Sequence, residues 1–348
     1  MKSLAVTKDH KLEIAEIPMP TPDKCSVLVK TLASGICGTD AKIIHGTFKN
    51  VSDYPCLLGH EAVGEVVEVG SAVKQFKAGD KLLVPFIDGC VDGYHSCWGG
   101  FSEYAICHDW MAMADCGMGP GTSGFEPFVY TQKAVPQSMD NAAAVMMITL
   151  REVLAACHNF RFRAGESIVI YGAGPVGLSF VRFAKLLGLG PVVVVDISDE
   201  KFGEAQDMGA DYTFNSTTCD LTEKILSICP DGVDYCLDAA GVNSLIMTSM
   251  KLIKNNGHIL TYGISPKLEM QLGWVDAPYN WNLSFFQFPD KQLEGAVHEQ
   301  LLSWIDLGLI DPLKFVSHII PFDNILEGFG IVERRESFKK IVIDYTAK

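Results

Sequence analysis

The feature that most constrains the fold is a glycine-rich turn between an apolar strand and a helix. Ser167–Tyr171 has the pattern of a buried strand, and a helical pattern begins at Pro175. The segment that contains the turn and the first helical residues is Gly172-Ala173-Gly174-Pro175-Val176-Gly177. In such a GxGxxG sequence the glycines permit the tight turn, the approach of a pyrophosphate and the packing of helix on strand. The segment therefore predicts a dinucleotide site at a helix N-terminus.

An acidic residue follows at the position where a ribose would lie. A second apolar strand, Val192–Val195, ends in Asp196, roughly 20 residues beyond the glycine turn, as this kind of site requires. Its carboxylate can accept hydrogen bonds from both ribose hydroxyls and would repel a 2′-phosphate. We therefore expect NAD rather than NADP. The alternative is a glycine-rich turn followed by a coincidental aspartate.

The surrounding sequence predicts two domains. Between residues 146 and 285, apolar runs such as Val233–Leu237 and His258–Tyr262 alternate with helical patterns, which is typical of a doubly wound parallel sheet. The preceding part, 1–145, has short β-like runs punctuated by Gly and Pro. Because 286–348 returns to a helix, Gln292–Leu307, and to β-like ends such as Lys340–Asp344, we expect it to complete the first domain.

Composition excludes several classes of protein. The formal net charge is −14, whereas nucleic acid and anionic membranes both require a basic face. No apolar run approaches the roughly 20 residues that span a bilayer, and the start of the chain does not resemble a signal peptide. The eleven cysteines are scattered without a CxxC pair, so they are not a disulfide framework. We expect a cytoplasmic protein.

Three potential zinc ligands lie in two short blocks. Cys37 and His60 offer the thiolate and imidazole that zinc prefers, and Glu61 offers an oxygen. Three protein ligands would leave a fourth position for water or a substrate oxygen. Asp40 could fix the tautomer of the histidine, and Thr39 could carry a hydroxyl proton away. From residue types alone, a core cysteine, a satisfied histidine and a surface glutamate remain an open alternative.

These blocks resemble the zinc-type medium-chain dehydrogenases, most closely the polyol branch that includes sorbitol and threonine dehydrogenases. The matching motifs, in the family's order, are Cys37-Gly38-Thr39-Asp40, Gly59-His60-Glu61, Gly79-Asp80, Gly99-Gly100-Phe101-Ser102-Glu103-Tyr104 and Gly172–Gly177. The resemblance covers nearly the whole chain. It implies an α/β protein with a GroES-like, β-rich catalytic domain and a Rossmann domain.

The resemblance also implies residue roles. Cys37, His60 and Glu61 would hold one catalytic zinc, and Thr39 would hydrogen-bond the reacting alcohol. Lys201 would join Asp196 at the adenosine ribose. The implied reaction transfers a hydride between NAD and a secondary alcohol or ketone, with a polyol, sugar or sugar-derived substrate. The family is commonly dimeric or tetrameric, so we expect a homo-oligomer.

A structural zinc is not expected. Many relatives hold a second zinc with four closely spaced cysteines before the Gly-Gly-Phe block, but here that interval contains only Cys90 and Cys97. A site assembled from these two with Cys107 and Cys116 remains the alternative.

Two substitutions indicate a substrate pocket with little charge. Met146 stands where relatives often have an acidic residue, and Gln287 stands where polyol dehydrogenases have an arginine. The alternative is that this alignment slips by a few residues. His45 either lines the pocket as a catalytic residue or caps a turn.

Two other functions compete with a zinc dehydrogenase. A zinc-free reductase of the same superfamily would lack the Cys37 and Gly59-His60-Glu61 blocks. A catalytically idle NAD-binding protein, crystallin-like or regulatory, is favoured only by the loss of the acidic residue at Met146.

Overall fold

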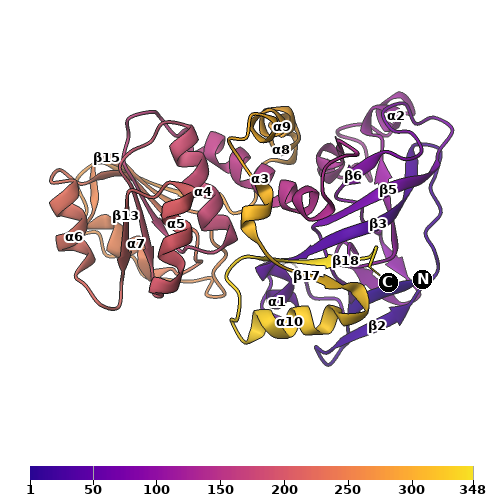
Figure 1. Ribbon diagram of the computed structural model, residues 1–348, viewed down its shortest axis with the longest axis horizontal. Helices are drawn as coiled ribbons and strands as arrows, with labels where there is room; N and C mark the ends of the chain where they lie inside the picture. Colours follow the sequence, from indigo (N-terminus) through magenta and orange to yellow (C-terminus); the bar gives the residue numbers. More distant parts are fainter. Residues whose placement is uncertain (50, 348) are drawn as a thin grey trace. The chain divides into compact units, whose positions relative to one another are not determined.

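The computed structural model describes residues 1–49 and 51–347, which form two compact units (Figure 1). Unit 1 comprises Met1–Arg151 and Lys291–Lys348, and unit 2 comprises Glu152–Asp290. Unit 1 is thus discontinuous. Both boundaries lie a few residues beyond the positions 145 and 285 that we expected from the sequence.

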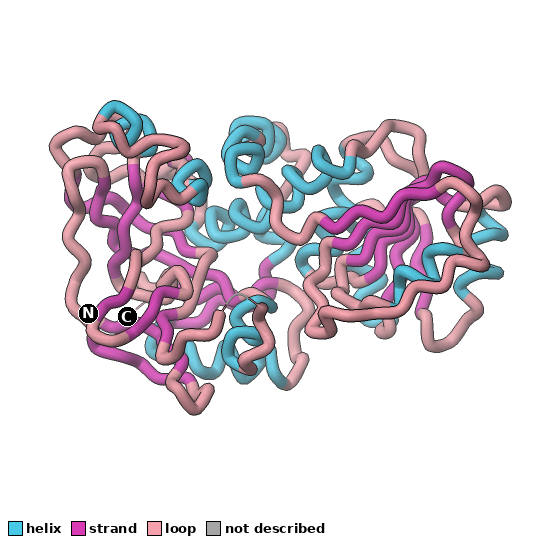
Figure 2. The backbone as a smooth tube through the Cα atoms, turned by 180° about the vertical axis from the view of Figure 1, so that it is seen from behind, coloured by secondary structure: helices cyan, strands magenta, loops and turns pink. Residues whose placement is uncertain are grey.

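Unit 2 contains a six-stranded sheet in the order β13-β12-β11-β14-β15-β16, and all of its neighbouring strands are parallel (Figure 2). Its strands are β11 (Ile168–Tyr171), β12 (Val192–Asp196), β13 (Tyr212–Asn215), β14 (Val233–Asp238), β15 (Ile253–Thr261) and β16 (Trp281–Phe285). The chain runs outward from β11 to β13 and then returns to β14 on the other side. The carboxyl ends of β11 and β14 therefore form a topological switch point, where such sheets bind ligands.

Helices connect the strands of this sheet. They are α4 (Pro175–Leu186), α5 (Phe202–Met208), α6 (Leu221–Ile228) and α7 (Ser244–Met250), with a short 3-10 helix η2 (Asp199–Lys201). Helix α4 packs on β11 and β12, and α7 packs on β14 and β15. Helix α4 begins with Pro175, whose missing N–H costs nothing at a first helical position. The Asp220 side chain caps α6 by accepting from two backbone N–H groups.

Unit 1 is built on two sheets. The seven-stranded sheet has the order β10-β6-β5-β3-β18-β17, with β9 also pairing with β3. Its strands are β3 (Ser26–Ile36), β5 (Ala62–Val69), β6 (Lys81–Leu83), β9 (Tyr104–His108), β10 (Ala134–Val135), β17 (Val316–Pro321) and β18 (Lys340–Asp344). The five-stranded sheet contains β1 (Lys2–Val6), β2 (Leu12–Glu16), β4 (Cys56–Leu57), β7 (Cys90–Val91) and β8 (Tyr94–Ser96). Strand β18 pairs antiparallel with β3, which joins the last part of the chain to the first.

The helices of unit 1 are mostly short. They are α1 (Gly38–Ile44), α2 (Trp110–Asp115), α8 (Lys291–Ala296), α9 (His298–Asp306) and α10 (Ile325–Glu333), with the 3-10 helices η1 (Pro127–Thr131), η3 (Pro312–Phe315) and η4 (Phe322–Asn324). The longer helix α3 (Asn141–Phe160) crosses the boundary between the units.

One helix predicted from the sequence is divided in the structure. The segment Gln292–Leu307 forms α8 and α9, which are separated at Val297. In the last turn of α8, a Cβ on Gly295 would be only 2.4 Å from the Tyr130 carbonyl oxygen, so this position requires glycine, which is a poor helix former. Across the described ranges, no helix has both the length and the apolar character needed to cross a membrane.

Candidate active site

The end of β3 and the start of β5 bring the potential metal ligands together. Cys37 follows β3 directly, and Glu61 immediately precedes β5. The two strands are antiparallel, with Ser34 opposite Ala62, so their ends lie side by side. Ligand atoms of Cys37, His60 and Glu61 all lie within 4.8 Å of one another, the one such group of three among residues 1–49 and 51–347.

The local environment of these residues contradicts the alternative of unrelated structural roles. Cys37 is partly exposed rather than a core cysteine. His60 Nδ1 is buried without a hydrogen bond to any described residue. Glu61 is 4% exposed and is therefore not a surface glutamate. The group therefore contains a buried ring nitrogen, His60 Nδ1, that ordinary packing leaves without a hydrogen bond.

Asp40 orients this group from the first turn of α1. Its Oδ2 accepts a hydrogen bond of 2.8 Å from the Cys37 backbone N–H. Its Oδ1 lies 3.5 Å from His60 Nδ1, and neither of these buried atoms has another partner in the described structure. Burial alone would lower the pKa of His60, but Asp40 and Cys37 together raise that pKa well above its ordinary value. Asp40 thus faces one ring nitrogen and leaves Nε2 for a metal, as expected of an orienting carboxylate.

Glu61 has two partners that sequence analysis missed. Its Oε1 accepts a hydrogen bond of 2.8 Å from Thr149 Oγ1 in α3. Its Oε2 forms an ion pair of 2.5 Å with Lys340 Nζ at the start of β18. Burial raises the pKa of Glu61, but Lys340 and His60 outweigh this effect and lower the pKa below its usual value. No sequence signal distinguished Lys340 from Lys2, an exposed lysine at the start of β1.

An aromatic ring lies beside the histidine. The centroids of Trp98 and His60 are 5.2 Å apart, and Phe48 packs edge-on to the same indole at 6.4 Å. Trp98 has a φ of 70°, a left-handed conformation that is costly for a bulky residue and that concentrates at functional sites. Sequence analysis did not select this residue, although it directly precedes the Gly99-Gly100-Phe101 motif.

The remaining candidates in unit 1 lie at different places. Thr39 is in the first turn of α1 and is 9% exposed. His45 is exposed at the C-cap of the same helix, where its Nδ1 lies 2.7 Å from the Ala41 carbonyl oxygen. This contact corresponds to the second role considered for His45, which is to cap a turn. Met146 is fully buried in α3, whereas Thr149 on that helix is the residue that contacts Glu61.

The four cysteines considered for a structural zinc do not converge in the described residues, where the sole three-ligand group is the one above. Two of them lie beside other cysteines instead. Burial and a hydrogen bond to Cys116 raise the pKa of Cys25 to about 11. A hydrogen bond to Cys56, together with burial, raises the pKa of Cys97.

In unit 2 the glycine turn has the geometry that the motif requires. Gly172 has a φ of 99°, which favours glycine. A Cβ on Gly177 would lie 1.8 Å from the Gly172 carbonyl oxygen, so α4 packs directly on the turn. Gly174, the N-cap of α4, has no protein atom within 4 Å of such a Cβ. That side of the turn is open to a ligand.

Asp196 lies beside this turn at the end of β12. Its Oδ2 accepts a hydrogen bond of 2.8 Å from Ala173 N, which ties the second strand to the glycine turn. Lys201 Nζ lies 3.0 Å from both carboxylate oxygens. The structure therefore brings together the two residues that the resemblance placed at the ribose. Gln287, elsewhere in unit 2, donates its side-chain amide to the Gly263 carbonyl at 3.0 Å.

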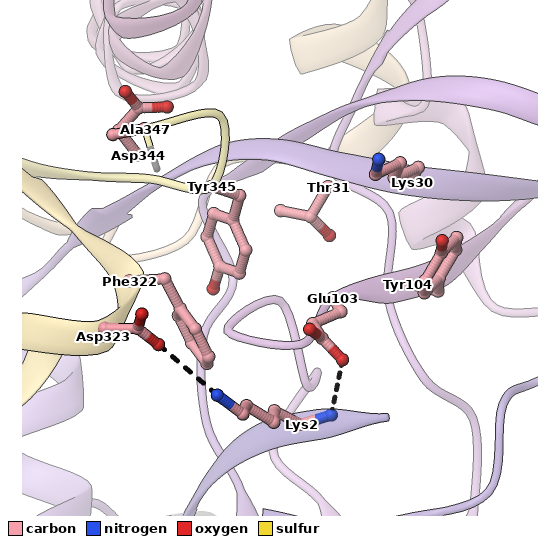
Figure 3. Close-up of a pocket in the computed structure, with 10 residues that line it drawn as sticks. All are labelled: Lys2, Lys30, Thr31, Glu103, Tyr104, Phe322, Asp323, Asp344, Tyr345 and Ala347. Atoms are coloured by element: carbon pink, nitrogen blue, oxygen red, sulfur yellow. Dashed lines mark hydrogen bonds and ion pairs between the residues drawn. The ribbon is translucent and has the colours of Figure 1, made fainter.

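A hollow of about 390 Å³ in unit 1 is separate from these groups (Figure 3). The residues that line the hollow do not include Cys37, His60 or Glu61. Lys2 at its floor is paired through Nζ with Asp323 at 3.4 Å and through its backbone N–H with Glu103 at 2.7 Å. The side chains of Lys2 and Asp323 are 46% and 83% exposed, so their ion pair is a surface contact, and the hollow shows no built ligand site.

Comparison with known proteins matches one domain family to part of each unit. The alcohol dehydrogenase GroES-like domain family matches residues 23–115, and the zinc-binding dehydrogenase family matches residues 175–287. Sorbitol dehydrogenase of Bacillus subtilis (strain 168) is 30% identical over 285 residues, which are 78% of this chain and 77% of that protein.

Solved structures with the same fold carry either nicotinamide cofactor. A zinc-binding dehydrogenase from Sinorhizobium meliloti 1021 bound to NADP has a TM-score of 0.81 at 24% identity, covering 99% of this chain and 98% of that one. An alcohol dehydrogenase (rspB) from Escherichia coli CFT073 complexed with NADH has a TM-score of 0.79 at 24% identity, covering 99% of both chains. With a GroES-like unit 1, a Rossmann-like unit 2 and this relationship to sorbitol dehydrogenase, the chain belongs to the polyol branch of the zinc-dependent medium-chain dehydrogenase family.

Proposed function

We propose that the protein is an oxidoreductase that transfers a hydride between NAD and a secondary alcohol or its ketone, using one catalytic zinc. The observation that carries this proposal is the convergence of Cys37, His60 and Glu61 within 4.8 Å. Thiolate, imidazole and carboxylate form a donor set that suits zinc. The Asp40 Oδ1 and His60 Nδ1 atoms, which have no other partner, support it because a metal on Nε2 would fix the ring in the tautomer that donates to Asp40.

Each residue of unit 1 then has a distinct task. Bound to these ligands, zinc would supply a Lewis acid that polarises the substrate oxygen. The Thr39 hydroxyl accepts the hydroxyl proton of the alcohol as it releases its own proton to water. Asp40 holds His60 in place, and Trp98 forms an apolar wall beside that ring. We assign no step to His45.

The cofactor proposal rests on the turn at the start of α4. Gly174 admits the pyrophosphate, and the helix N-terminus offers its unpaired N–H groups. The ribose hydroxyls hydrogen-bond to Asp196, with Lys201 beside them. Since structural neighbours carry NADH in one case and NADP in another, the preference for NAD rests on the charge of Asp196 alone.

We propose a polyol, sugar or sugar-derived substrate. The relationship to a sorbitol dehydrogenase supports a hydroxyl-rich molecule. The neutral residues Met146 and Gln287 favour a substrate that does not need a charged partner, which makes sorbitol itself a poor candidate.

We also propose a cytoplasmic homo-oligomer without a structural zinc. Strand β16 is at the edge of its sheet, and the aromatic residues on and after it are exposed, with Phe285 at 60% and Phe288 at 49%. An exposed apolar edge strand is an unfavourable surface unless another chain covers it. The lack of a disulfide framework among eleven cysteines suits a reducing compartment.

The test combines metal analysis with a substrate screen. The purified protein should contain about one zinc per chain, and it should form NADH with members of a panel of secondary alcohols, polyols and sugar acids. A zinc content near two per chain would mean that the scattered cysteines do bind a second zinc. Metal-free protein that neither takes up added zinc nor reduces NAD with any alcohol would support an idle NAD-binding protein instead.

A further inference from the structure

The ion pair between Glu61 and Lys340 is unusual in both its burial and its position. Each side chain is 4% exposed, the two residues are 279 positions apart, and their charged atoms are 2.5 Å apart. Burying two charges costs several kcal/mol each before their attraction repays it. Such a pair is poor evidence for stability, so its place beside the metal ligands requires another explanation.

The backbone holds the two partners against each other. The Glu61 carbonyl accepts from Gly35 N at 2.8 Å, and Lys340 precedes Ile341, which lies opposite Ile36 on β3. A Cβ on Gly35 would lie 2.7 Å from Glu61 Oε2 and 3.2 Å from Lys340 Cδ. Both side chains therefore meet over the one position of β3 that has no side chain.

Lys340 also changes the charge balance of the proposed metal site. With metal bound, Cys37 as a thiolate, Asp40 and Glu61 contribute three negative charges, and zinc contributes two positive charges. The ammonium group of Lys340 makes the sum zero. The Glu61 carboxylate would then be shared between two cations, of which one belongs to the protein.

We propose that Lys340 is a positioning residue that competes with the metal for Glu61 and keeps this carboxylate a weak, displaceable ligand. The inference rests on the proposed zinc site and adds Lys340 as a residue that sets its affinity for zinc. Because both cations share one carboxylate, each weakens the hold of the other, and this coupling is reciprocal. Glu61 can leave the metal at little cost, since Lys340 Nζ is already within hydrogen-bond distance.

The experiment measures zinc affinity rather than turnover. The full-length protein is stripped of metal, and zinc is titrated against a chromogenic chelator without NAD or alcohol. Lys340→Met removes the charge but keeps an unbranched chain, whereas Lys340→Arg keeps the charge. We expect the zinc Kd to fall at least roughly fivefold in Lys340→Met, the lower end of typical couplings, and to stay within about twofold of wild type in Lys340→Arg.

Thermal unfolding provides a second readout. Without metal, Lys340→Met leaves the buried Glu61 without its ion-pair partner, so the Tm of the metal-free form should fall below that of wild type. Zinc should then raise the Tm of this variant by more than it raises that of wild type. If the methionine variant does not fold, Lys340→Gln, which retains a donor for Glu61, takes its place in both measurements.

A double-mutant cycle separates competition for Glu61 from direct repulsion between Lys340 and zinc. In the Glu61→Gln background, Lys340→Met should tighten zinc binding clearly less than it does alone. Equal tightening in both backgrounds, or unchanged or weaker binding in Lys340→Met, overturns this inference while the zinc site stands. If the wild-type protein binds no zinc, the proposed function itself fails.

Discussion

The nucleotide turn of unit 2 is made of backbone, whereas the metal-ligand group of unit 1 is made of side chains. Gly172–Gly177 is one continuous segment whose N–H groups and glycines would perform the proposed binding. The group around Cys37 instead consists of side chains that come from the end of β3, from α1, α3 and β18, and from the residues before β5. The first site depends on local conformation, while the second depends on how distant elements pack and on whether their charges balance.

This difference predicts which changes affect stability and which affect binding. In a backbone site, a side chain on the open face should weaken the ligand without disturbing the fold. In a side-chain site, almost every change leaves a buried polar group without its partner, so binding and stability should change together.

The largest effect should follow removal of a metal ligand. Cys37→Ser should lose zinc and reduce turnover by at least about 1,000-fold, because several kcal/mol of Lewis-acid stabilisation disappear. It should still bind NADH with wild-type affinity, since the glycine turn lies in unit 2. Metal analysis, a turnover assay and NADH fluorescence measure the three quantities. Full zinc and full activity in this variant would refute the site.

Two glycines of the nucleotide turn should separate folding from binding. In Gly177→Ala the new Cβ would be 1.8 Å from the Gly172 carbonyl oxygen, so the variant should lose about 1–3 kcal/mol of stability or more. In Gly174→Ala no protein atom lies within 4 Å, so the Tm should stay near that of wild type. The NAD Kd of Gly174→Ala should nevertheless rise about tenfold, or 1.4 kcal/mol. Wild-type NAD binding in Gly174→Ala would mean that the pyrophosphate lies elsewhere.

A matched pair of glycines flanks the cysteine in unit 1. Gly35→Ala would place a Cβ 2.7 Å from Glu61 Oε2 and 2.9 Å from Val145, and it should cost about 1–3 kcal/mol together with much of the zinc affinity. Gly38→Ala has nothing within 4 Å and should keep zinc, with stability unchanged or raised by up to about 1 kcal/mol. Urea unfolding and zinc titration on both variants measure the contrast, and equal losses in the two would contradict it.

A smaller effect is expected for cofactor choice. Asp196→Ser should raise the KM for NAD and lower the ratio of kcat/KM for NAD over NADP by roughly tenfold, equivalent to 1.4 kcal/mol. The Ala173 N–H also loses its acceptor, so the Tm serves as a control. Equal kcat/KM for the two cofactors in the unmodified protein would show that this carboxylate does not select NAD.

A further prediction concerns proton transfer. Thr39→Ala should retain zinc and fold normally but turn over about 100-fold more slowly, since only the path of the hydroxyl proton is removed. Thr39→Ser, which keeps the hydroxyl, should recover most of the rate. Equal rates for the alanine and serine variants would remove Thr39 from the mechanism.

The same contrast explains what the sequence could predict. Strand β12 has the predicted last residue and β18 the predicted bounds, and the glycine turn lies where its spacing placed it, because each depends on consecutive residues. The candidate ligands could be selected because they are adjacent to recognisable motifs. Lys340 and Thr149 could not be selected, because lysine is rarely buried and a threonine inside a helix carries no signal of its partner. Trp98 was missed because its importance depends on a backbone conformation that residue type does not reveal.

The distance of 279 residues between Glu61 and Lys340 also has a consequence for synthesis on the ribosome. At about 5–20 residues per second, the lysine emerges roughly 15 s to one minute after the glutamate. All of unit 2 is translated within that interval and can fold as a continuous segment. During this time β3 and β5 of the nascent chain have no lysine for Glu61. A metal ion that reaches the nascent chain in this interval meets the carboxylate before its protein partner exists.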